Sequence, residues 1–347
     1  MEHKKTLLYI CTNDGSDMRI NKELRTLSSN FAITYIDIGQ GEVFTFGKQY
    51  CHSFHLIKGK RNNPFTILKL FLKLIQLKLA KYDSVHVVNE KLIIFLYPII
   101  FHKHLVVDIF DSIFLINNKS RNKNIFLKKI LYAPAKTLLV TDENRKSLMP
   151  DFAKHKVAIL PNYPYKYEGP VSEKQNNQLT ILYNGWLGEN RGTEFIYKCL
   201  AADTDLHVIM AGWIADETSK KLLDHPQVIY KGIMKQDEVL QLAATDCDYI
   251  LCVYAPINEN NINASPNKIY DSIQTRTPII TNAEVVVAQF VATNEIGVVI
   301  DNYYHFDAAE LLHELRIRKN QFVFNDTLRT IYTWENVEGV LLAAHSL

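Results

Sequence analysis

The chain is poor in the patterns that mark disulfide scaffolds, zinc sites and dinucleotide-binding loops. Its five cysteines, at positions 11, 51, 199, 247 and 252, form no C-x-x-C pair and show no metal-ligand spacing. Such a scattered, odd-numbered set is typical of reduced thiols in a cytosol. No G-x-G-x-x-G is present, because Gly39, Gly41 and Gly47 have another spacing and follow the second expected strand. A dinucleotide-binding oxidoreductase is therefore not expected.

Long apolar runs and a leader pattern are also missing. The longest uncharged apolar run, residues 92–101, is too short to span a bilayer. The chain opens with Glu2, His3 and two lysines before an expected strand, so we predict no signal peptide. Its 347 residues are 47% hydrophobic and 22% charged, which suits two globular domains. We expect a cytoplasmic protein, peripheral at most at the inner face of the plasma membrane.

Charge is divided unevenly along the chain. Residues 1–160 carry 25 Lys and Arg against 13 Asp and Glu, and the remainder carries 14 against 24. A basic half joined to an acidic half indicates that the first half faces something anionic, such as a membrane surface or a phosphorylated acceptor. A merely solvated basic face is the alternative. Nucleic acid is not an expected partner.

The first half is typical of a doubly wound α/β domain. An apolar strand at 6–11 leads through a polar loop into a helix at about 18–29. Two later strands, at 84–88 and 105–110, are followed directly by polar residues. Open α/β sheets bind ligands at the carboxyl ends of their strands. The residues expected on this ligand-binding side are Asp14, Asp17, Asn89, Glu90 and Asp111.

Residues 65–81 (FTILKLFLKLIQLKLAK) predict a helix that is apolar nearly all round. Lys69, Lys73 and Gln76 form a narrow polar stripe. The expected arrangement is a helix buried in the domain with its lysines reaching out to solvent. A helix lying on a membrane surface is the alternative.

The most informative stretch lies in the second half, at residues 265–271 (SPNKIYD). Pro266 suits the first turn of a helix, so a helix is predicted to begin there. Lys268 then lies in that turn, where free N–H groups and the helix dipole also favour an anion. A diphosphate would suit this site, and Asp271 would accept hydrogen bonds from ligand hydroxyls. A capped helix with a solvated lysine is the alternative.

SPNKIYD followed by TPIIT resembles the donor-binding helix of nucleotide-sugar glycosyltransferases of the GT-B fold, in particular family 4. Further stretches resemble the family in the same order: DxRIxKE at 17–23, VVDIFD at 106–111, PNYP at 161–164, and YTWE at 332–335. The resemblance covers nearly the whole chain. It implies a domain of residues 1–163, a linker at 164–178, a second domain at 179–326, and a last helix at 327–347 that packs back on the first domain. The implied fold class is α/β, with two Rossmann-like domains facing a cleft.

The resemblance also implies the roles of particular residues. The family's G-R-hydrophobic-x-x-x-K-G segment, whose two cations hold the donor diphosphate, corresponds to residues 185–192, with Trp186 at the Arg position and Arg191 at the Lys position. Asn263 and Asp271 stand where two glutamates are common. The catalytic residues implied are Asp111, Lys268 and Arg191. The donor-binding residues implied are Gly15, Ser16, Gly185, Arg191, Gly232, Ile233, Met234, Asn263, Ser265, Pro266, Asn267, Lys268 and Asp271.

No metal or cofactor is expected. Residues 246–248 form a D-x-D, the metal motif of the other large glycosyltransferase fold, but they precede an apolar strand and are expected to be structural. The implied function is transfer of a sugar from a nucleotide diphosphate sugar to a glycan or lipid-linked acceptor, with retention, in bacterial surface polysaccharide synthesis. If the reaction inverts, Asp111 is the candidate base. A sugar-nucleotide epimerase of the same fold and a non-catalytic binding protein stay open.

Overall fold

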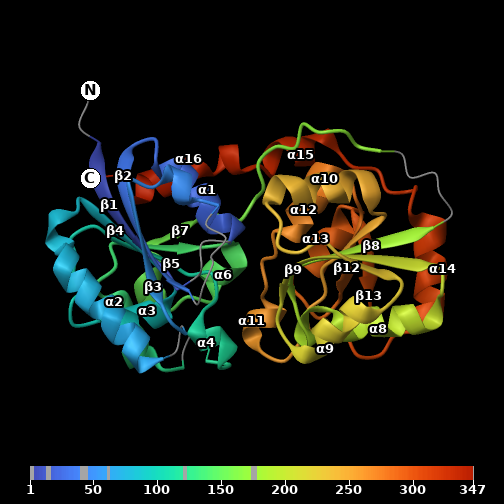
Figure 1. Ribbon diagram of the computed structural model, residues 1–347, viewed down its shortest axis with the longest axis horizontal. Coiled ribbons are helices and arrows are strands. Elements are labelled where there is room, and N and C mark those ends of the chain that lie inside the picture. Colours follow the sequence, from blue (N-terminus) through green and yellow to red (C-terminus); the bar gives the residue numbers. More distant parts are fainter. Residues whose placement is uncertain are drawn as a thin grey trace. The chain divides into compact units, whose positions relative to one another are not determined.

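The structure is a computed structural model that describes residues 4–12, 17–39, 46–60, 63–119, 123–172 and 178–346. The predictions for Asp14, Gly15 and Ser16 concern residues outside these ranges. The chain divides into two compact units: unit 1 consists of Met1–Pro161 with Val337–Leu347, and unit 2 of Asn162–Asn336. Figure 1 gives the labels of the elements. Among the described residues, no helix combines the length and hydrophobicity that a membrane-spanning segment needs.

Unit 1 is built on a parallel sheet with the strand order β3-β2-β1-β4-β5-β6-β7. Its strands are β1 (Lys5–Ile10), β2 (Phe31–Gly39), β3 (Ser53–Lys58), β4 (Ser84–Val88), β5 (Leu105–Asp108), β6 (Thr137–Val140) and β7 (Val157–Ile159). Its helices are α1 (Met18–Leu27), α2 (Pro64–Leu77), α3 (Glu90–Leu96), α4 (Ile113–Ile116), α5 (Ile125–Tyr132), α6 (Glu143–Ser147), α7 (Asp151–Lys154) and α16 (Glu338–Ala344). Every residue of β4 and β5 is buried, as expected where helices cover both faces of a parallel sheet.

The last helix, α16, returns to unit 1 and packs against α1. The two helices lie on one face of the sheet, and α2 and α3 lie on the other (Figure 1). The Thr26 hydroxyl of α1 donates to Glu338 Oε2 at 2.7 Å. His345, at the end of α16, is fully buried. The C-terminal residues are therefore part of the unit 1 core.

The expectation that residues 65–81 form a buried helix is wrong for one face of α2. Thr66, Leu70 and Leu74 are buried against the sheet, and the opposite side is exposed, with Phe65 at 75% and Leu72 at 57%. The spacing of apolar residues could not show which side of the helix is exposed, because apolar residues occur on both sides of it.

Unit 2 is built on a second parallel sheet, with the order β10-β9-β8-β11-β12-β13. Its strands are β8 (Leu179–Leu187), β9 (Leu206–Ile214), β10 (Val228–Tyr230), β11 (Tyr249–Leu251), β12 (Ile279–Asn282) and β13 (Gly297–Ile300). Its helices are α8 (Thr193–Ala202), α9 (Glu217–Lys221), α10 (Gln236–Asp246), α11 (Glu259–Ile262), α12 (Lys268–Thr275), α13 (Ala288–Thr293), α14 (Ala308–Arg318) and α15 (Asp326–Ile331). Helices α8 and α9 cover one face, and α10, α12 and α13 the other (Figure 1).

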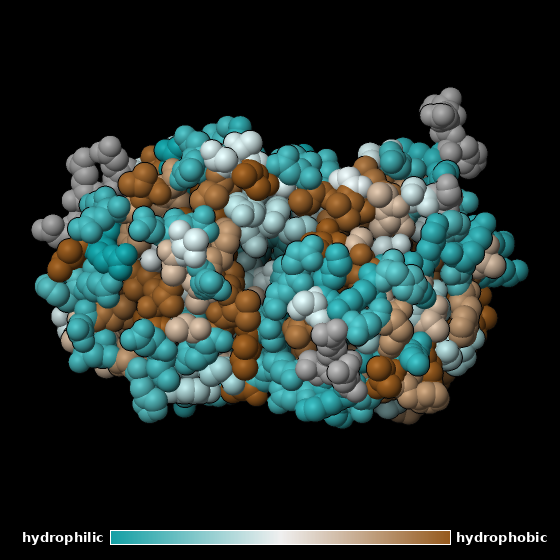
Figure 2. Space-filling view, turned by 180° about the vertical axis from the view of Figure 1, so that it is seen from behind, coloured by the Kyte–Doolittle hydropathy of each residue, from teal (hydrophilic) through white to brown (hydrophobic). Residues whose placement is uncertain are grey.

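Two parallel sheets with covering helices confirm the predicted α/β class. Each unit has its own apolar core, centred on Ile10, Val87 and Val107 in unit 1 and on Ile181, Val208 and Leu251 in unit 2. The surface over these cores is mixed, and apolar patches interrupt a largely hydrophilic face (Figure 2).

Candidate functional site

The sheet of unit 2 changes direction between β8 and β11. From β8 the chain first adds β9 and β10 on one side, and then crosses to add β11, β12 and β13 on the other. At such a switch point the loops leaving the two central strands diverge, which opens a ligand-binding crevice outside the carboxyl ends of the strands. The ends of β8 and β11 therefore mark the candidate site.

Backbone is accessible at this edge of the sheet. Gly185, near the end of β8, has φ +87°, and a Cβ placed there would meet only the Lys268 Cε, at 3.8 Å. Gly232, which follows β10, has φ +76°, and no described atom lies within 4 Å of a Cβ placed on it. A side chain would strain the backbone at either position. Both glycines leave main chain open to a ligand, and Gly185 does so directly beside Lys268.

Lys268 is the first residue of α12, two residues beyond Pro266, so the predicted helix exists but begins slightly later than predicted. Its Nζ donates to the Leu251 carbonyl at the end of β11, at 2.9 Å. The amine also lies 5.8 Å from the centre of the Tyr183 ring of β8. The side chain thus lies across the switch point. Burial lowers the pKa of its ammonium to about 8, and the charge of Arg191 acts in the same direction, opposed by Cys252 and Asp271.

Arg191 ends the short 3-10 helix Glu189–Arg191, which follows β8. Its guanidinium carbon lies 4.1 Å from the centre of the Tyr254 ring. Within the described part of the chain, neither Arg191 nor Lys268 forms an ion pair with a carboxylate within 4 Å. Two neighbouring cations that lack a carboxylate partner create a positive potential suited to a polyanion.

Asp271 lies one turn further along α12 and is 3% exposed. Its oxygens accept from the Gln236 Nε2 at 3.1 Å and from the Asn267 Nδ2 at 3.3 Å. These two amides orient the carboxylate beside Lys268. Asn263 is half-buried, and its amide donates to the Glu259 carbonyl at 2.8 Å.

Packing behind α12 fixes its position. The ring of Tyr270 on α12 packs against Tyr163, Phe290 and Tyr332, with ring centres 4.5 to 6.2 Å apart. Near the other end of the helix, the Gln274 amide donates to the Arg329 carbonyl and accepts from the Tyr167 amide. Three separate segments therefore pack against α12 and fix the helix that carries Lys268.

The remaining predicted donor residues lie around this edge. Ser265 is half-buried and Pro266 buried, both directly before α12. Ile233 and Met234 are half-buried in the loop after β10. That loop is joined to β9 by a hydrogen bond from the Gly212 amide to the Gly232 carbonyl, at 2.8 Å.

In unit 1, three of the predicted acceptor-side residues make local structural contacts. Asp17 caps α1 by accepting from the Arg19 and Ile20 amides. The Asn89 Oδ1 accepts from the amides of Phe110 and Asp111 at 2.8 and 3.1 Å, and the backbone of Asn89 has φ 67° and ψ 146°. This backbone conformation is uncommon for a residue with a side chain. The Asn89 side chain links the loop after β4 to the residues that follow β5.

Glu90 is 1% exposed, and its carboxylate accepts from the Tyr132 hydroxyl, from Ser112 and from the Ile113 amide. This is the environment of a structural carboxylate. Asp111, by contrast, is exposed at the end of β5. Its role toward an acceptor stays a prediction.

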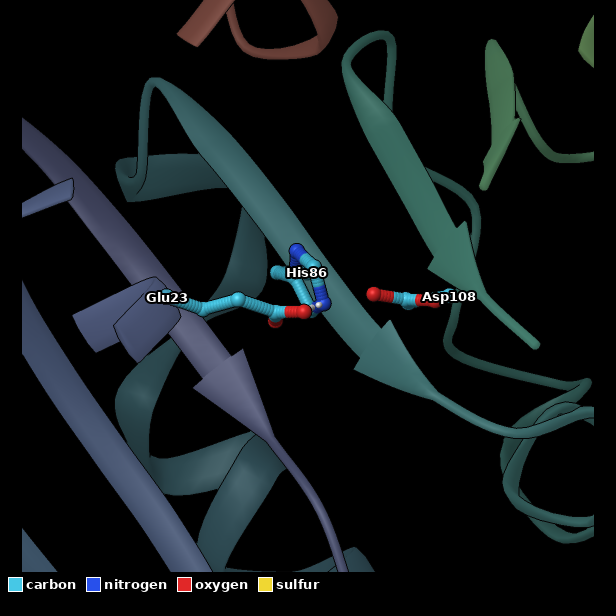
Figure 3. A group of neighbouring side chains, drawn as sticks. All are labelled: Glu23, His86 and Asp108. Carbon is cyan, nitrogen blue, oxygen red and sulfur yellow. Dashed lines mark ion pairs between the residues drawn. The ribbon is translucent and has the colours of Figure 1, made fainter. Parts of the chain in front are cut away.

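A buried polar cluster in unit 1 escaped the sequence analysis. Glu23, His86 and Asp108 offer ligand atoms that lie within 4.8 Å of one another, with all three residues buried (Figure 3). Arg19 lies among them: its Nε is 2.8 Å from Glu23, and one Nη contacts both oxygens of Asp108 at 2.8 and 2.9 Å. Burial alone would lower the Arg19 pKa, but Asp108 and Glu23 outweigh it and raise the pKa. Burial, and then the charge of Asp108, raises the pKa of Glu23 well above its usual range. A permanent cation therefore already occupies the place of a metal ion beside Asp108, and we assign the cluster a structural role.

This cluster extends to the C-terminal residues. The Tyr9 hydroxyl donates to Glu23 at 2.6 Å, the Tyr9 ring stacks on His86, and His86 Nδ1 lies 3.0 Å from His345 Nε2. The i, i+4 spacing of Arg19 and Glu23 was visible in the sequence, but their distant partners were not.

The two aspartates of the D-x-D at residues 246–248 lie in different environments. Asp246 is exposed at the end of α10, whereas Asp248 is buried. Asp248 accepts from the Thr180 amide at 2.8 Å and lies 3.5 Å from the Lys319 ammonium. These contacts are those of a carboxylate that anchors the start of β8.

No family model and no curated protein matches this sequence. Solved structures do match its fold. The Anabaena protein HepE, solved with UDP and glucose, has a TM-score of 0.68 at 12% identity, over 99% of this chain and 96% of that one. Sucrose-phosphate synthase from Thermosynechococcus elongatus has a TM-score of 0.70 at 12% identity, over 98% and 97%. WaaG, a glycosyltransferase of lipopolysaccharide biosynthesis, has 0.59 at 14% identity, over 96% and 95%.

These comparisons confirm the predicted GT-B fold, because the matched structures are glycosyltransferases of that fold and each is covered almost end to end.

Proposed function

We propose that this chain is a glycosyltransferase that moves a sugar from a nucleotide diphosphate sugar to a glycan or lipid-linked acceptor. The observation that carries the proposal is the pair of cations at the switch point of unit 2, Lys268 and Arg191, beside the open backbone of Gly185. A diphosphate would be the anionic partner of these two cations. Two matched structures of HepE, one in complex with UDP and glucose and the other with UDP-glucose, support a uridine nucleotide as the first donor to test.

The chemistry follows from where charge develops. As the bond between the sugar and the diphosphate breaks, negative charge grows on the leaving phosphate. Lys268 and Arg191, already fixed in position, stabilise that charge without reorganising. The diphosphate in turn favours the protonated form of Lys268, whose pKa burial has lowered to about 8. Asp271, held by two amides, is placed to accept a hydroxyl of the donor.

The stereochemistry is proposed to be retaining, with the leaving phosphate taking the proton of the acceptor, as membership of family 4 would imply. No metal is required in this scheme, since two cationic side chains replace it. Should the reaction invert, the exposed Asp111 at the end of β5 is the candidate base. The acceptor is proposed to lie at the cytoplasmic membrane, in bacterial surface polysaccharide synthesis, which the similarity to WaaG supports.

A thermal-shift screen tests the donor site. UDP, GDP and ADP, and their glucose conjugates, are added with and without Mg²⁺ to the wild-type protein and to Lys268→Ala. At a hundred times its dissociation constant, the true ligand should add about 2.7 kcal/mol of stability. We expect a metal-independent shift with one nucleotide, lost in Lys268→Ala and kept in the control Lys198→Ala, whose side chain lies on α8. An equal shift in all three proteins would overturn the assignment of the site.

A second function, binding without transfer, is favoured by one observation. Trp186 stands at the position where the resemblance implies an arginine, so one expected cation is missing. The Trp186 side chain is 56% exposed. A binding protein would show the thermal shift but neither transfer nor slow hydrolysis of the donor. An epimerase would convert the nucleotide sugar in the absence of any acceptor. Product analysis with and without a glycan acceptor separates the three.

A further inference from the structure

Helix α2 of unit 1 has two apolar faces. Thr66, Leu70 and Leu74 pack on the sheet. On the opposite side, four large apolar side chains are exposed to between 50% and 75%: Phe65, Leu68, Leu72 and Ile75. Their spacing of three and four residues places them in one stripe along the helix. A solvent-exposed stripe of this kind marks an interaction surface.

Lysines border this stripe. Lys69 and Lys73 lie along one edge of it, and at the N-terminal end of the helix Lys58, Lys60 and Lys69 line an open depression of about 430 Å³ together with Asn63 and Phe65. Within the described residues, none of these lysines pairs with a carboxylate within 4 Å. The depression therefore offers several cations directly beside exposed apolar surface.

The charge of the whole segment points the same way. Residues 43–82 contain eight Lys and Arg and no Asp or Glu. An apolar stripe alone would suit a protein partner as well, but the absence of acidic residues favours an anionic surface. Each lysine near anionic lipid headgroups adds attraction, while the apolar side chains enter the boundary between headgroups and acyl chains.

We propose that the exposed face of α2 docks on an anionic phospholipid bilayer. Phe65, Leu68, Leu72 and Ile75 enter the interface, and Lys58, Lys60 and Lys69 receive headgroup phosphates in the depression at the start of the helix. This inference rests on one part of the proposed function, the acceptor at the membrane. It identifies the surface through which the chain would reach that membrane. Ile94 and Phe95 of α3, on the same side of the sheet as α2, are also exposed, at 42% and 37%.

Flotation with vesicles of phosphatidylcholine, with and without phosphatidylglycerol, tests the docking surface. Leu68→Glu/Leu72→Glu breaks the apolar stripe, and Lys60→Glu/Lys69→Glu reverses charge in the depression. The control Lys220→Glu/Lys221→Glu makes the same charge change on α9 of unit 2. We expect binding only when phosphatidylglycerol is present, with both test variants weakened about tenfold or more and the control unchanged.

Two results would overturn the proposal. One is equal binding by all variants, or equal binding to neutral vesicles. The other is a concentration-dependent dimer in solution that Leu68→Glu/Leu72→Glu abolishes without any binding to vesicles, which would give the stripe to a second copy of this chain. The thermal shift with nucleotides, measured without vesicles on the same variants, tests the donor site separately. A variant that keeps this shift is folded, so its loss of flotation reports on docking alone.

Discussion

The two units differ in whether their clustered cationic side chains are paired with acidic groups. In unit 1, the Arg19 guanidinium contacts both Glu23 and Asp108 at 2.8 Å. Burial, and then the charge of Asp108, raises the pKa of Glu23 well above its usual range and so favours its neutral form. The one cation is therefore balanced by the one charge of Asp108. In unit 2, Lys268 and Arg191 lie close enough for Arg191 to lower the Lys268 pKa, and the described chain places no carboxylate within ion-pair distance of either. The first arrangement is complete without a ligand, and the second is not.

This difference separates structural from functional charge. A buried network whose cation is already bonded to its own acidic groups stabilises one conformation and offers no free charge to a substrate. An unbalanced pair of cations costs stability in the absence of ligand, and the cost is recovered when an anion binds. Sites that carry such a cost are those at which stability and activity are expected to oppose each other. Substitutions in the two places should therefore have opposite signs.

The largest effect is expected at Arg19. Arg19→Met leaves Glu23 and Asp108 buried without their cation, so we expect a loss of about 3–5 kcal/mol in the free energy of unfolding. Urea denaturation, with a probe in each unit, measures it. The matched control is Arg276→Met, which removes an ion pair to Asp326 whose members are 41% and 75% exposed. That change should cost less than about 1 kcal/mol. Equal losses in the two variants would contradict the assignment of Arg19 to a structural network.

The next effect concerns pH. Donor binding needs the charged form of Lys268, whose pKa is about 8 in the free protein. Above pH 8 the free protein must take up a proton to bind, so the affinity for the nucleotide sugar should fall, at most about tenfold per pH unit. Lys268→Arg stays protonated throughout this range. Calorimetric titrations between pH 7 and 10 should show the decline in the wild type and a flat profile in the variant; parallel profiles would assign the titration to another group.

A smaller effect of opposite sign is expected on stability without ligand. The Lys268 pKa is 10.5 in the unfolded chain and about 8 in the folded one. The folded protein therefore holds fewer protons between these values, and wild-type stability rises with pH across that window. Below pH 8 the cost of the buried charge is fully present. Lys268→Met should then stabilise the free protein by on the order of 1 kcal/mol, after allowing for the lost hydrogen bond to Leu251.

A thermal melt at pH 7 measures this change. The gain should shrink toward pH 10, because the wild-type lysine loses its charge in that range. A lower melting temperature for Lys268→Met at pH 7 would mean that the lysine is structural. The donor-induced shift, absent in the same variant, distinguishes loss of binding from loss of the fold.

The sequence predicted unit 2 better than unit 1 for a physical reason. Lys268 and Asp271 lie within one turn of the same helix, and Pro266 lies two residues before that helix begins, so local spacing alone brings them together. The unit 1 network joins Tyr9, Arg19 and Glu23 to partners as distant as Asp108 and His345. No local pattern encodes such contacts, since they depend on strand order.

The same limit applies to Asp17, Glu90 and α2. The place of Asp17 and Glu90 on the acceptor side stays a prediction, whereas the cap on α1 and the hydroxyl bonded to Glu90 are contacts that sequence position did not reveal. For α2, the apolar residues can be counted from the sequence, but the neighbouring elements that could cover them cannot. Which side of that helix is covered is decided by the rest of the fold.

The smallest effect is expected at Trp186. Trp186→Arg, at the end of β8, restores the cation that the resemblance implies and adds a third cation to the pair formed by Lys268 and Arg191. A planar guanidinium binds phosphate oxygens in pairs, so the affinity for the nucleotide diphosphate should rise about two- to tenfold, with donor turnover measured in parallel. Val323→Arg, at a position 85% exposed, adds the same charge elsewhere in unit 2 and should leave the affinity unchanged. If both variants bind the nucleotide equally tightly, overall charge rather than the site is responsible. If Trp186→Arg alone binds more weakly, the indole itself contacts the donor, and the site recognises it through stacking as well as charge.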